Sequence, residues 1–231
     1  MKSLPNVTLI SYDNTGDATR TLKALQHCAS LIAFADVILC CNVFPLSVPP
    51  KAKGDVYPVH VDATGYRGAM EWEVFGVNDY VDTDFALCIH HDGYIINPDM
   101  WRDYWLDYDF IGAPWPKNPH PFHPGKADLP YRVGNTGFCL KSKPFMNYTA
   151  SLRELFVKSY KTDKYGQTLG GDTFYCQQQR PFLEEIGMKF APVEVAADFS
   201  WESTIEEYPN GRPDAFGFHS FALENKQVVR L

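Results

Sequence analysis

The segment 6–13, NVTLISYD, predicts the fold of the chain, because it is a β-branched run that ends in polar residues. The residues after it, TGDATRTLKALQHCASLI (15–32), carry apolar side chains at helical spacing behind a Thr/Asp start, and ADVILCCN (35–42) is a second apolar run. Such a strand–helix–strand opening is the usual start of an α/β nucleotide-binding sheet, in which the carboxyl end of the first strand faces the ligand crevice. We therefore expect an α/β fold with a mixed, mostly parallel central sheet.

The rest of the sequence predicts further elements of the same domain. We expect a strand at 56–61, a helix at 66–81, a buried strand and its turn at 83–93, helices at 142–160 and 170–187, and a late strand at 188–200. The segment 101–142 is rich in Pro, Gly and aromatic residues, and irregular segments of this length usually shape a binding surface. No repeat, low-complexity segment or linker divides the sequence, so we expect a single domain spanning 1–231.

Composition and charge exclude several classes of protein. The chain has 231 residues, 45% of them hydrophobic, and a net charge of -7, which argues against affinity gained by neutralising many phosphates. The six cysteines lie mostly in apolar surroundings without a C-x-x-C pair, which favours buried free thiols over a zinc ribbon or redox motif. No charged leader precedes a long apolar segment, so we expect a soluble, cytoplasmic protein without membrane insertion.

The stretch HHDG, at 90–93, follows the apolar run that predicts the central strand. Asp-Gly is a common turn, so Asp92 has an ordinary structural interpretation. His90 and Asp92 share one side of an extended segment at period two, however, and could face the same cation or diphosphate. His91 points the other way and is a candidate for packing. The dinucleotide and P-loop fingerprints are absent from the sequence.

Four motifs occur in the order known from a protein family. They are YVDTDFALCIHHDGYIINPDMWRDYWLDYDFIGAPWP (80–116), VGNTGFCLKS (133–142), GGDTFYCQQQRPFLEEIGMKFAP (170–192) and FGFH (216–219). From about residue 7 to residue 219 the chain resembles a little-characterised microbial family placed among the GT-A-type glycosyltransferases, and more remotely the fringe and β1,3-galactosyltransferase type. The resemblance implies a GT-A-like, Rossmann-related nucleotide-binding fold.

The resemblance also implies a metal site. GT-A enzymes use an Asp-x-Asp motif to hold a divalent cation, Mn²⁺ or Mg²⁺, on the diphosphate of the donor, where it neutralises the charge of the leaving group. Here His90 stands at the first position and only Asp92 matches, so His90 is a candidate for a metal ligand or a phosphate contact. His219 resembles the C-terminal histidine that completes the metal site in several GT-A families. Its alternative is a histidine hydrogen-bonded within an aromatic shell.

The resemblance further implies a general base at Asp172. This residue matches the acidic helix start of the related motif, in which Gly171 stands in the place of a Glu. An Asp at a helix N-terminus is ordinarily a cap. The functional alternative is a carboxylate that takes the proton from an acceptor hydroxyl as it attacks the anomeric carbon.

Small polar and aromatic residues are candidates for contacts with sugar. Gly137 follows Asn135 and Thr136, whose side chains could hydrogen-bond the hydroxyls of a donor sugar or an acceptor. Trp115 lies between prolines, where its flat face suits a sugar ring, although a large aromatic residue is more often part of the core. Gly171 is a further candidate for contact with the acceptor or the sugar.

The segment SYDNTGD at the end of the first strand lies where a GT-A fold meets a nucleotide. We expect Ser11, Asp13 and Asn14 to contact the donor nucleotide, together with Gly93 and the two residues of the HHD motif named above. Asx residues also initiate turns, so a structural role is the alternative.

The function we expect is transfer of a sugar from a nucleotide sugar, a UDP-sugar above all, to a hydroxyl acceptor by single displacement with inversion. The acceptor is a glycan, a small molecule or modified DNA. One alternative is transfer to hydroxymethylated bases in phage DNA, against which the acidic net charge weighs. The other is a non-catalytic module that binds a sugar or nucleotide, which the missing first aspartate supports.

Overall fold

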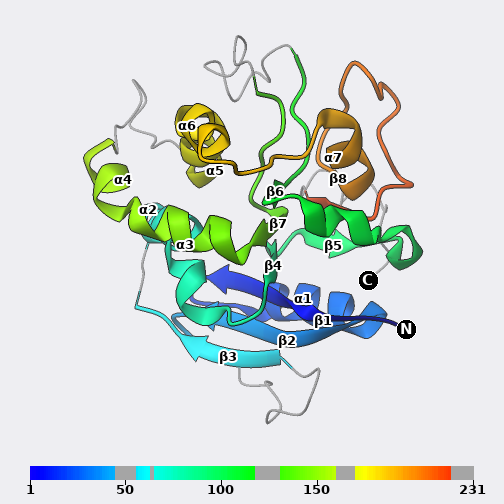
Figure 1. Cartoon of the computed structure of the whole chain (residues 1–231). Helices are drawn as coiled ribbons and strands as arrows, with labels where there is room; N and C mark the ends of the chain where they lie inside the picture. Colours follow the sequence, from blue (N-terminus) through cyan, green and yellow to red (C-terminus); the bar gives the residue numbers. More distant parts are fainter. Residues whose placement is uncertain (45–55, 63–64, 118–130, 160–169, 220–231) are drawn as a thin grey trace.

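The computed structural model describes residues 1–44, 56–62, 65–117, 131–159 and 170–219, which form two β-sheets and the helices around them (Figure 1). The strands are β1 (Lys2–Asp13), β2 (Ile32–Cys41), β3 (Val56–His60), β4 (Phe85–Ile89), β5 (Gly93–Ile95), β6 (Phe110–Ile111), β7 (Phe138–Ser142), β8 (Ser200–Trp201) and β9 (Gly217–His219). The α-helices are α1 (Thr19–Leu31), α2 (Gly65–Val74), α3 (Lys143–Ser151), α4 (Arg153–Ser159), α5 (Gly171–Thr173), α6 (Arg180–Glu185) and α7 (Val193–Phe199). Shorter helical turns are the 3-10 helices η1 (Gly76–Tyr80), η2 (Pro98–Met100) and η3 (Asp103–Asp107) and the π-helix η4 (Phe174–Gln178).

The larger sheet has six strands in the order β3-β2-β1-β4-β7-β6. β1 pairs in parallel with β2 and β4, β3 extends β2 in parallel, and β7 and β6 continue the sheet in antiparallel pairs. The predicted α/β fold with a mixed, mostly parallel sheet is therefore confirmed. The strand order reverses between β1 and β4, and ligands of open α/β sheets bind outside the carboxyl ends of the strands at such a reversal.

Helix α1 and the inner strands form because their apolar residues have the periods that burial requires. In α1, Leu22, Leu25 and Cys28 are spaced three apart and buried, and the helix packs along β1 and β2 and reaches β5. In β1, Val7 and Leu9 are fully buried, and the residue between them is buried as well. Both faces of this strand are thus covered, as is usual in parallel sheets.

The smaller sheet, in the order β5-β9-β8, positions the end of the described chain beside β4. β9 pairs antiparallel with β5, so that His219 lies opposite Gly93. Phe138 of β7 packs against β9, since a Cβ atom at Gly217 would lie 2.2 Å from its ring. The rings of Phe138 and Phe216 have centroids 5.9 Å apart. This aromatic contact attaches the small sheet to the central one.

The prediction of a strand over residues 188–200 is wrong, because most of its second half is helix α7. Alternating valines at Val193 and Val195 are typical of a strand, but the buried side chains are Ala196, Ala197 and Phe199, of which the first and last are three residues apart. The first turn closes when Ala196 N donates to Pro192 O (2.9 Å). The buried face has the period of a helix, so packing decides the conformation against the local pattern.

The predicted long helices are interrupted. Residues 142–160 hold α3 and α4, and α3 begins where Ser142 Oγ accepts a hydrogen bond from Phe145 N (3.2 Å). Residues 170–187 hold α5, η4 and α6, and Pro181 stands in the first turn of α6. A proline cannot donate the next hydrogen bond of a helical ladder but is accepted in a first turn, so the chain starts a new helix there. Residues 66–81 likewise divide into α2 and η1.

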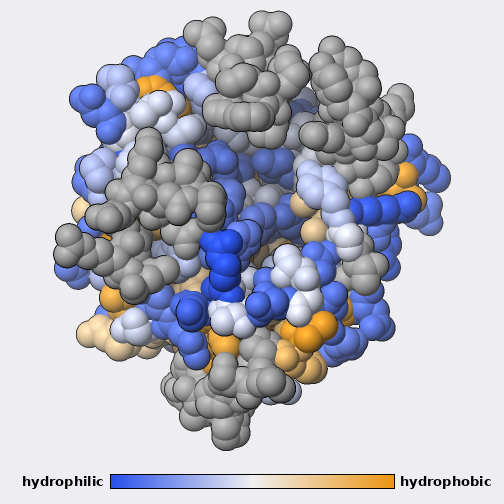
Figure 2. Space-filling view, turned by 180° about the vertical axis from the view of Figure 1, so that it is seen from behind, coloured by the Kyte–Doolittle hydropathy of each residue, from blue (hydrophilic) through white to orange (hydrophobic). Residues whose placement is uncertain are grey.

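The face of the molecule seen in Figure 2 carries its hydrophobic residues in separate groups. On the face shown in Figure 2, hydrophilic residues occupy the hollowed centre, and hydrophobic residues lie nearer the edges. Within the described residues, none of the helices combines the length and hydropathy that crossing a bilayer requires. The six cysteines all fall in described parts of the chain, where they are buried and free, as predicted.

Candidate functional site

Three side chains that could bind a cation meet at the carboxyl end of β4. His90, Asp92 and His219 each offer one ligand atom, and these atoms all lie within 4.8 Å of one another. His90 and Asp92 belong to the turn after β4, in which Gly93 N donates to His90 O (3.1 Å), and His219 comes from β9. The structure thus brings together the three residues that the sequence predicts as metal ligands.

Asp92 is the buried member of this triad, with 8% of its surface exposed. Its Oδ1 lies 3.1 Å from His219 Nε2, yet within the described part of the chain this oxygen has no hydrogen-bond partner. Burial disfavours the charged carboxylate, but His219, with smaller effects from His91 and His90, outweighs burial and holds the pKa of Asp92 well below its usual value. Asp92 therefore offers an anionic oxygen with unused bonding capacity, which suits a cation ligand.

His90 is held from two sides. Its backbone N donates to Gly137 O (2.8 Å), and its side-chain Nε2 lies 2.9 Å from Glu73 Oε1. Burial lowers the pKa of His90, but the hydrogen bond and charge of Glu73 outweigh that effect and raise it. His91 is half-buried and lies outside the triad, and burial lowers its pKa.

His219 is fixed by the segment that the sequence predicts to contact sugar. Asn135 has a left-handed backbone, with a φ of 66°, and its Oδ1 accepts from Gly137 N (2.8 Å). Asn135 Nδ2 then faces His219 Nδ1 at 3.1 Å. Asn135 therefore contacts the ring through Nδ1, and Nε2 is the ring nitrogen of His219 that faces Asp92.

Gly137 leaves space for the His219 ring, because a Cβ atom at Gly137 would lie 2.1 Å from His219 Nε2. We expect Gly137→Ala to displace the ring and to lower the free energy of unfolding by about 1–3 kcal/mol, the usual cost of overpacking. Urea denaturation measures this cost. The double variant Gly137→Ala/His219→Ala removes the obstructing ring, so its cost should be smaller than the sum of the single costs. Additive costs would show that the ring and Gly137 do not compete for space.

Sequence reasoning missed two buried charges behind the triad. Glu73 is 5% exposed, and its Oε2 accepts from Thr136 Oγ1 (3.0 Å), while Lys141 is 2% exposed and donates from Nζ to Glu73 O (2.8 Å). A signal was present for Glu73, because it lies three residues after Met70 and four before Val77, both buried apolar positions. Lys141, inside the apolar run of β7, could have been flagged in the same way.

The predicted nucleotide contacts lie at the end of β1, next to β4. Ser11 is 1% exposed and donates to Ile89 O (2.5 Å), so its hydroxyl joins the two strands. Asp13 Oδ1 accepts from Thr15 N (2.9 Å), and Asp13 Oδ2 accepts from Thr21 Oγ1. The Asp13 carboxylate therefore shapes the turn after β1.

Asn14 and Trp115 are the remaining residues predicted to contact the nucleotide and a sugar. Asn14 is half-buried and donates from Nδ2 to Gly65 O (2.7 Å), at the start of α2. Trp115 is also half-buried, and its ring covers Gly134, where a Cβ atom would lie 1.9 Å from the indole. Trp115 therefore lies against the residue that precedes Asn135.

Gly171 and Asp172 approach the triad through Glu73. A Cβ atom at Gly171 would lie 3.1 Å from Glu73 Oε2, so α5 begins beside the carboxylate that holds His90. Gly170, not Asp172, is the N-cap of α5, and Asp172 Oδ1 accepts from Thr173 N (2.6 Å) in the first turn. Asp172 is half-buried and outside the metal-ligand triad.

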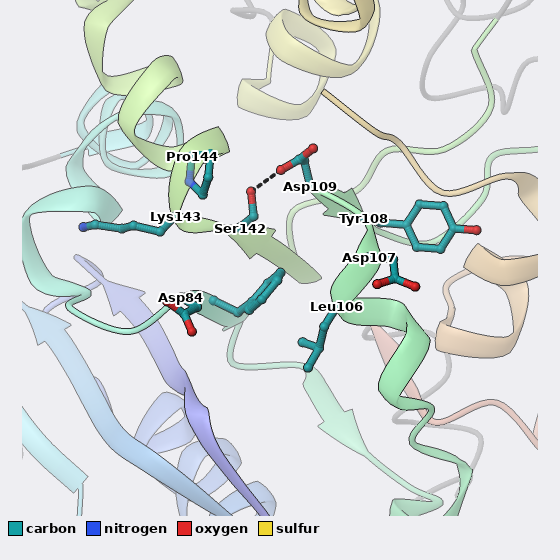
Figure 3. Close-up of a pocket in the computed structure, with 9 residues that line it drawn as sticks. Asp84, Leu106, Asp107, Tyr108, Asp109, Ser142, Lys143 and Pro144 are labelled. Atoms are coloured by element: carbon teal, nitrogen blue, oxygen red, sulfur yellow. Dashed lines mark hydrogen bonds between the residues drawn. The ribbon is translucent and has the colours of Figure 1, made fainter. Parts of the chain in front are cut away.

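A separate cavity of about 280 Å³ lies at the opposite end of β4 (Figure 3). Its lining includes Asp84, Phe85, Asp107 and Asp109. Asp109 is already engaged by Ser142 Oγ (2.5 Å), as the dashed line in Figure 3 marks, and Lys143 points away from Asp107. Since β4 runs from Phe85 to Ile89 and the triad follows its carboxyl end, this cavity is not part of the candidate site.

Comparison with known proteins identifies the family. Residues 71–219 match the model described as "Protein of unknown function (DUF5672)", which is more than half of the chain. The chain belongs to the DUF5672 family. The matched part of this DUF5672 chain contains Glu73, the turn after β4 and the segment 135–137, and it ends at His219. No curated protein sequence matches the chain significantly.

Two solved structures have a fold similar to that of the DUF5672 chain. A glycosyltransferase involved in the glycosylation of the major capsid of PBCV-1 has a TM-score of 0.58 and 11% identity, with 96% of this chain and 98% of that chain covered. The galactosyltransferase LgtC, in complex with donor and acceptor sugar analogues, has a TM-score of 0.56 and 11% identity, with 93% and 87% covered. At this identity the similarity establishes the GT-A fold, as predicted. The remote resemblance to the fringe type stays a prediction.

The donor set of the triad decides which cations fit. Two imidazoles and one carboxylate suit Mn²⁺ and other first-row transition ions, whereas Mg²⁺ and Ca²⁺ prefer oxygen ligands. The buried carboxylate of Asp92 supplies the anionic ligand. Of the predicted pair of cations, Mn²⁺ therefore fits the described residues better than Mg²⁺.

Proposed function

We propose that this DUF5672 chain is a glycosyltransferase that moves a sugar from a nucleotide sugar, preferably a UDP-sugar, to a hydroxyl acceptor with inversion. The observation that carries the proposal is the triad of His90, Asp92 and His219, which lies at the carboxyl end of β4 in a GT-A fold. This is the edge of an open α/β sheet where ligands bind. The domain, on this proposal, is a single unit of 1–231.

Different residues of the chain would bind the cation and the nucleotide. Asp92, with the two imidazoles, would hold a divalent cation, which when bound neutralises the diphosphate of the donor. The turn of Asp13 and Asn14 at the end of β1 would face the nucleotide, with Ser11 and Gly93 supporting that surface from within.

The sugar and the acceptor would lie between this turn and the segment 134–137. Asn135 and Thr136 are buried beside His219 and Glu73, so they would border the donor sugar rather than solvent. Trp115, which covers Gly134, would present the outer face to a sugar ring. Gly137 would act only by leaving room for His219.

Asp172 would take the proton of the acceptor hydroxyl. The hydroxyl oxygen forms a bond to the anomeric carbon, the proton passes to the Asp172 carboxylate, and the bond to the nucleoside diphosphate breaks on the opposite face. This single displacement inverts the anomeric configuration. The support is positional, because Gly171 at the same helix start lies so near Glu73 that a Cβ atom there would be 3.1 Å from Oε2 of the carboxylate behind His90.

Thermal shift with a panel of nucleotide sugars tests the proposal. A ligand at 100 times its Kd stabilises by about 2.7 kcal/mol, and about 2–4 °C per kcal/mol for a chain of this size gives a rise of roughly 5–10 °C. We expect this rise with UDP-sugars and Mn²⁺ together, and a smaller rise when Mg²⁺ replaces Mn²⁺.

The same panel separates an enzyme from a binding module. Release of UDP with time, by slow donor hydrolysis or by transfer, is expected from a glycosyltransferase. Stable binding without UDP release with any acceptor would instead identify a non-catalytic module. If none of the nucleotide sugars shifts the melting temperature with Mn²⁺ present, the proposed donor site is wrong.

A further inference from the structure

The buried carboxylate of Glu73 connects helix α2 with the turn that carries His90. Glu73 Oε1 lies 2.9 Å from His90 Nε2, and its Oε2 accepts from Thr136 Oγ1 at 3.0 Å. Both carboxylate oxygens thus have a partner from a different loop of the site. A carboxylate only accepts hydrogen bonds, so the His90 Nε2 facing it must carry a hydrogen.

This hydrogen decides which nitrogen of His90 remains for a cation. With Nε2 donating to Glu73, the free lone pair of a neutral ring is on Nδ1. A carboxylate behind a metal-binding histidine is a common arrangement, because it fixes the ring orientation and makes the histidine a stronger ligand. One ring nitrogen of each histidine of the triad and one oxygen of Asp92 lie within 4.8 Å of one another.

The surroundings explain how the Glu73 carboxylate can be buried. Lys141 donates from Nζ to Glu73 O (2.8 Å), and its own side chain is buried. Glu73 is in the last turn of α2, where the helix dipole favours a positive charge. The ammonium of Lys141 therefore supplies a compensating charge to the interior that holds Glu73.

We propose that Glu73 is a positioning residue for the metal site, which orients His90 so that Nδ1 faces the cation and also holds Thr136 in place. This inference rests on the proposed function, because it assumes that the triad binds a cation. It adds a residue that contacts neither the cation nor the substrate. It also assigns the ligand atom of His90.

Substitution of Glu73 tests this role through metal affinity. Glu73→Met removes both acceptor oxygens at similar length, and loss of an outer partner of a metal ligand typically costs about 10- to 100-fold in metal affinity. We expect that loss for Mn²⁺, measured by calorimetry on the full chain, and a changed visible spectrum of the Co²⁺-loaded protein. Glu73→Gln keeps an acceptor for His90, so it should lose less than Glu73→Met.

The matched control is Glu71→Met, on the same helix. Glu71 pairs with Arg67 Nε (2.8 Å) on the surface of α2, and its loss removes the same charge without touching His90. We expect Mn²⁺ affinity within about twofold of wild type, because a partly exposed pair contributes little.

A double variant tests the role of Glu73 if Glu73→Met alone does not fold. If Glu73→Met leaves Lys141 buried without compensation, the double variant Glu73→Met/Lys141→Met is compared with Lys141→Met alone, and the same 10- to 100-fold loss is expected. Wild-type affinity and an unchanged Co²⁺ spectrum in the folded Glu73 variants would overturn the inference alone. Absence of Mn²⁺ binding to the wild-type protein would overturn the proposed metal site and this inference with it.

Discussion

Asp172→Asn is expected to lower the turnover of sugar transfer by roughly a hundredfold or more, because a general base typically contributes about 10²- to 10⁴-fold. The substitution leaves an oxygen that can still accept from Thr173 N, the bond that Asp172 Oδ1 makes at 2.6 Å. The N-cap of α5 is Gly170, so no cap is lost. Melting temperature and donor affinity should therefore barely change, and turnover under saturating substrates is the quantity to measure.

A matched control separates base catalysis from a general effect of removing an acid. Asp103 also stands in the first turn of a short helix, η3, and it pairs with Lys2 at the start of β1. Asp103→Asn should retain wild-type turnover. If Asp172→Asn also transfers sugar at the wild-type rate, another group takes the proton and the proposed mechanism is wrong.

The outline of the fold could be predicted because its first half follows strong periodic patterns. The apolar runs of β1, β2 and β4 and the three-residue spacing in α1 each specify one conformation. Helix α7 could not be predicted in this way, because its valines favour a strand, whereas its buried face packs through Phe199 against Trp105 and Phe138, which are distant in the sequence. The small sheet itself depends on pairing between β5 and β9, which are far apart in the sequence.

The sequence predicts the part of the candidate site whose residues lie close together in the chain. It does not predict the part whose residues are distant in the chain. The alternation of His90 and Asp92 after an apolar strand could be interpreted directly. His219 required the resemblance to a known family, since its place opposite Gly93 depends on the pairing of two distant strands. Glu73 could not be predicted because a charged residue in a helix is usually at the surface, and the partners of its buried carboxylate, His90 and Thr136, are distant in the sequence.

The roles of single residues near the site also depend on tertiary contacts. Ser11 and Asp13 are predicted from their place at the end of β1, but their side chains bond to the protein itself. Gly137 is predicted to lie at the sugar-binding surface, and in the structure it is the residue against which the His219 ring lies. A sequence can place a polar residue at the right edge of a sheet without fixing what its side chain contacts.

Asp92→Asn is expected to weaken Mn²⁺ binding by more than about 100-fold, since losing even an outer partner of a ligand costs about 10- to 100-fold. The amide replaces the only anionic ligand of the triad with a neutral group of the same shape. His219→Ala should have a comparable effect, because it removes one imidazole and the residue that holds the pKa of Asp92 low. His90→Ala removes the other imidazole of the triad and should weaken Mn²⁺ binding at least as much as Glu73→Met, whereas a smaller loss would show that His90 contacts only phosphate.

Calorimetry with Mn²⁺, followed by UDP in the presence of Mn²⁺, measures these losses, and circular dichroism checks that each variant is folded. Asp107→Asn is the control, because Asp107 is exposed at the cavity on the opposite end of β4 and should leave Mn²⁺ binding unchanged. Asp92→Asn and His219→Ala change different ligand atoms of one site, so both variants must lose Mn²⁺ affinity if the proposed site is correct. Retained Mn²⁺-dependent binding of UDP in both of them would show that the metal lies elsewhere in the protein.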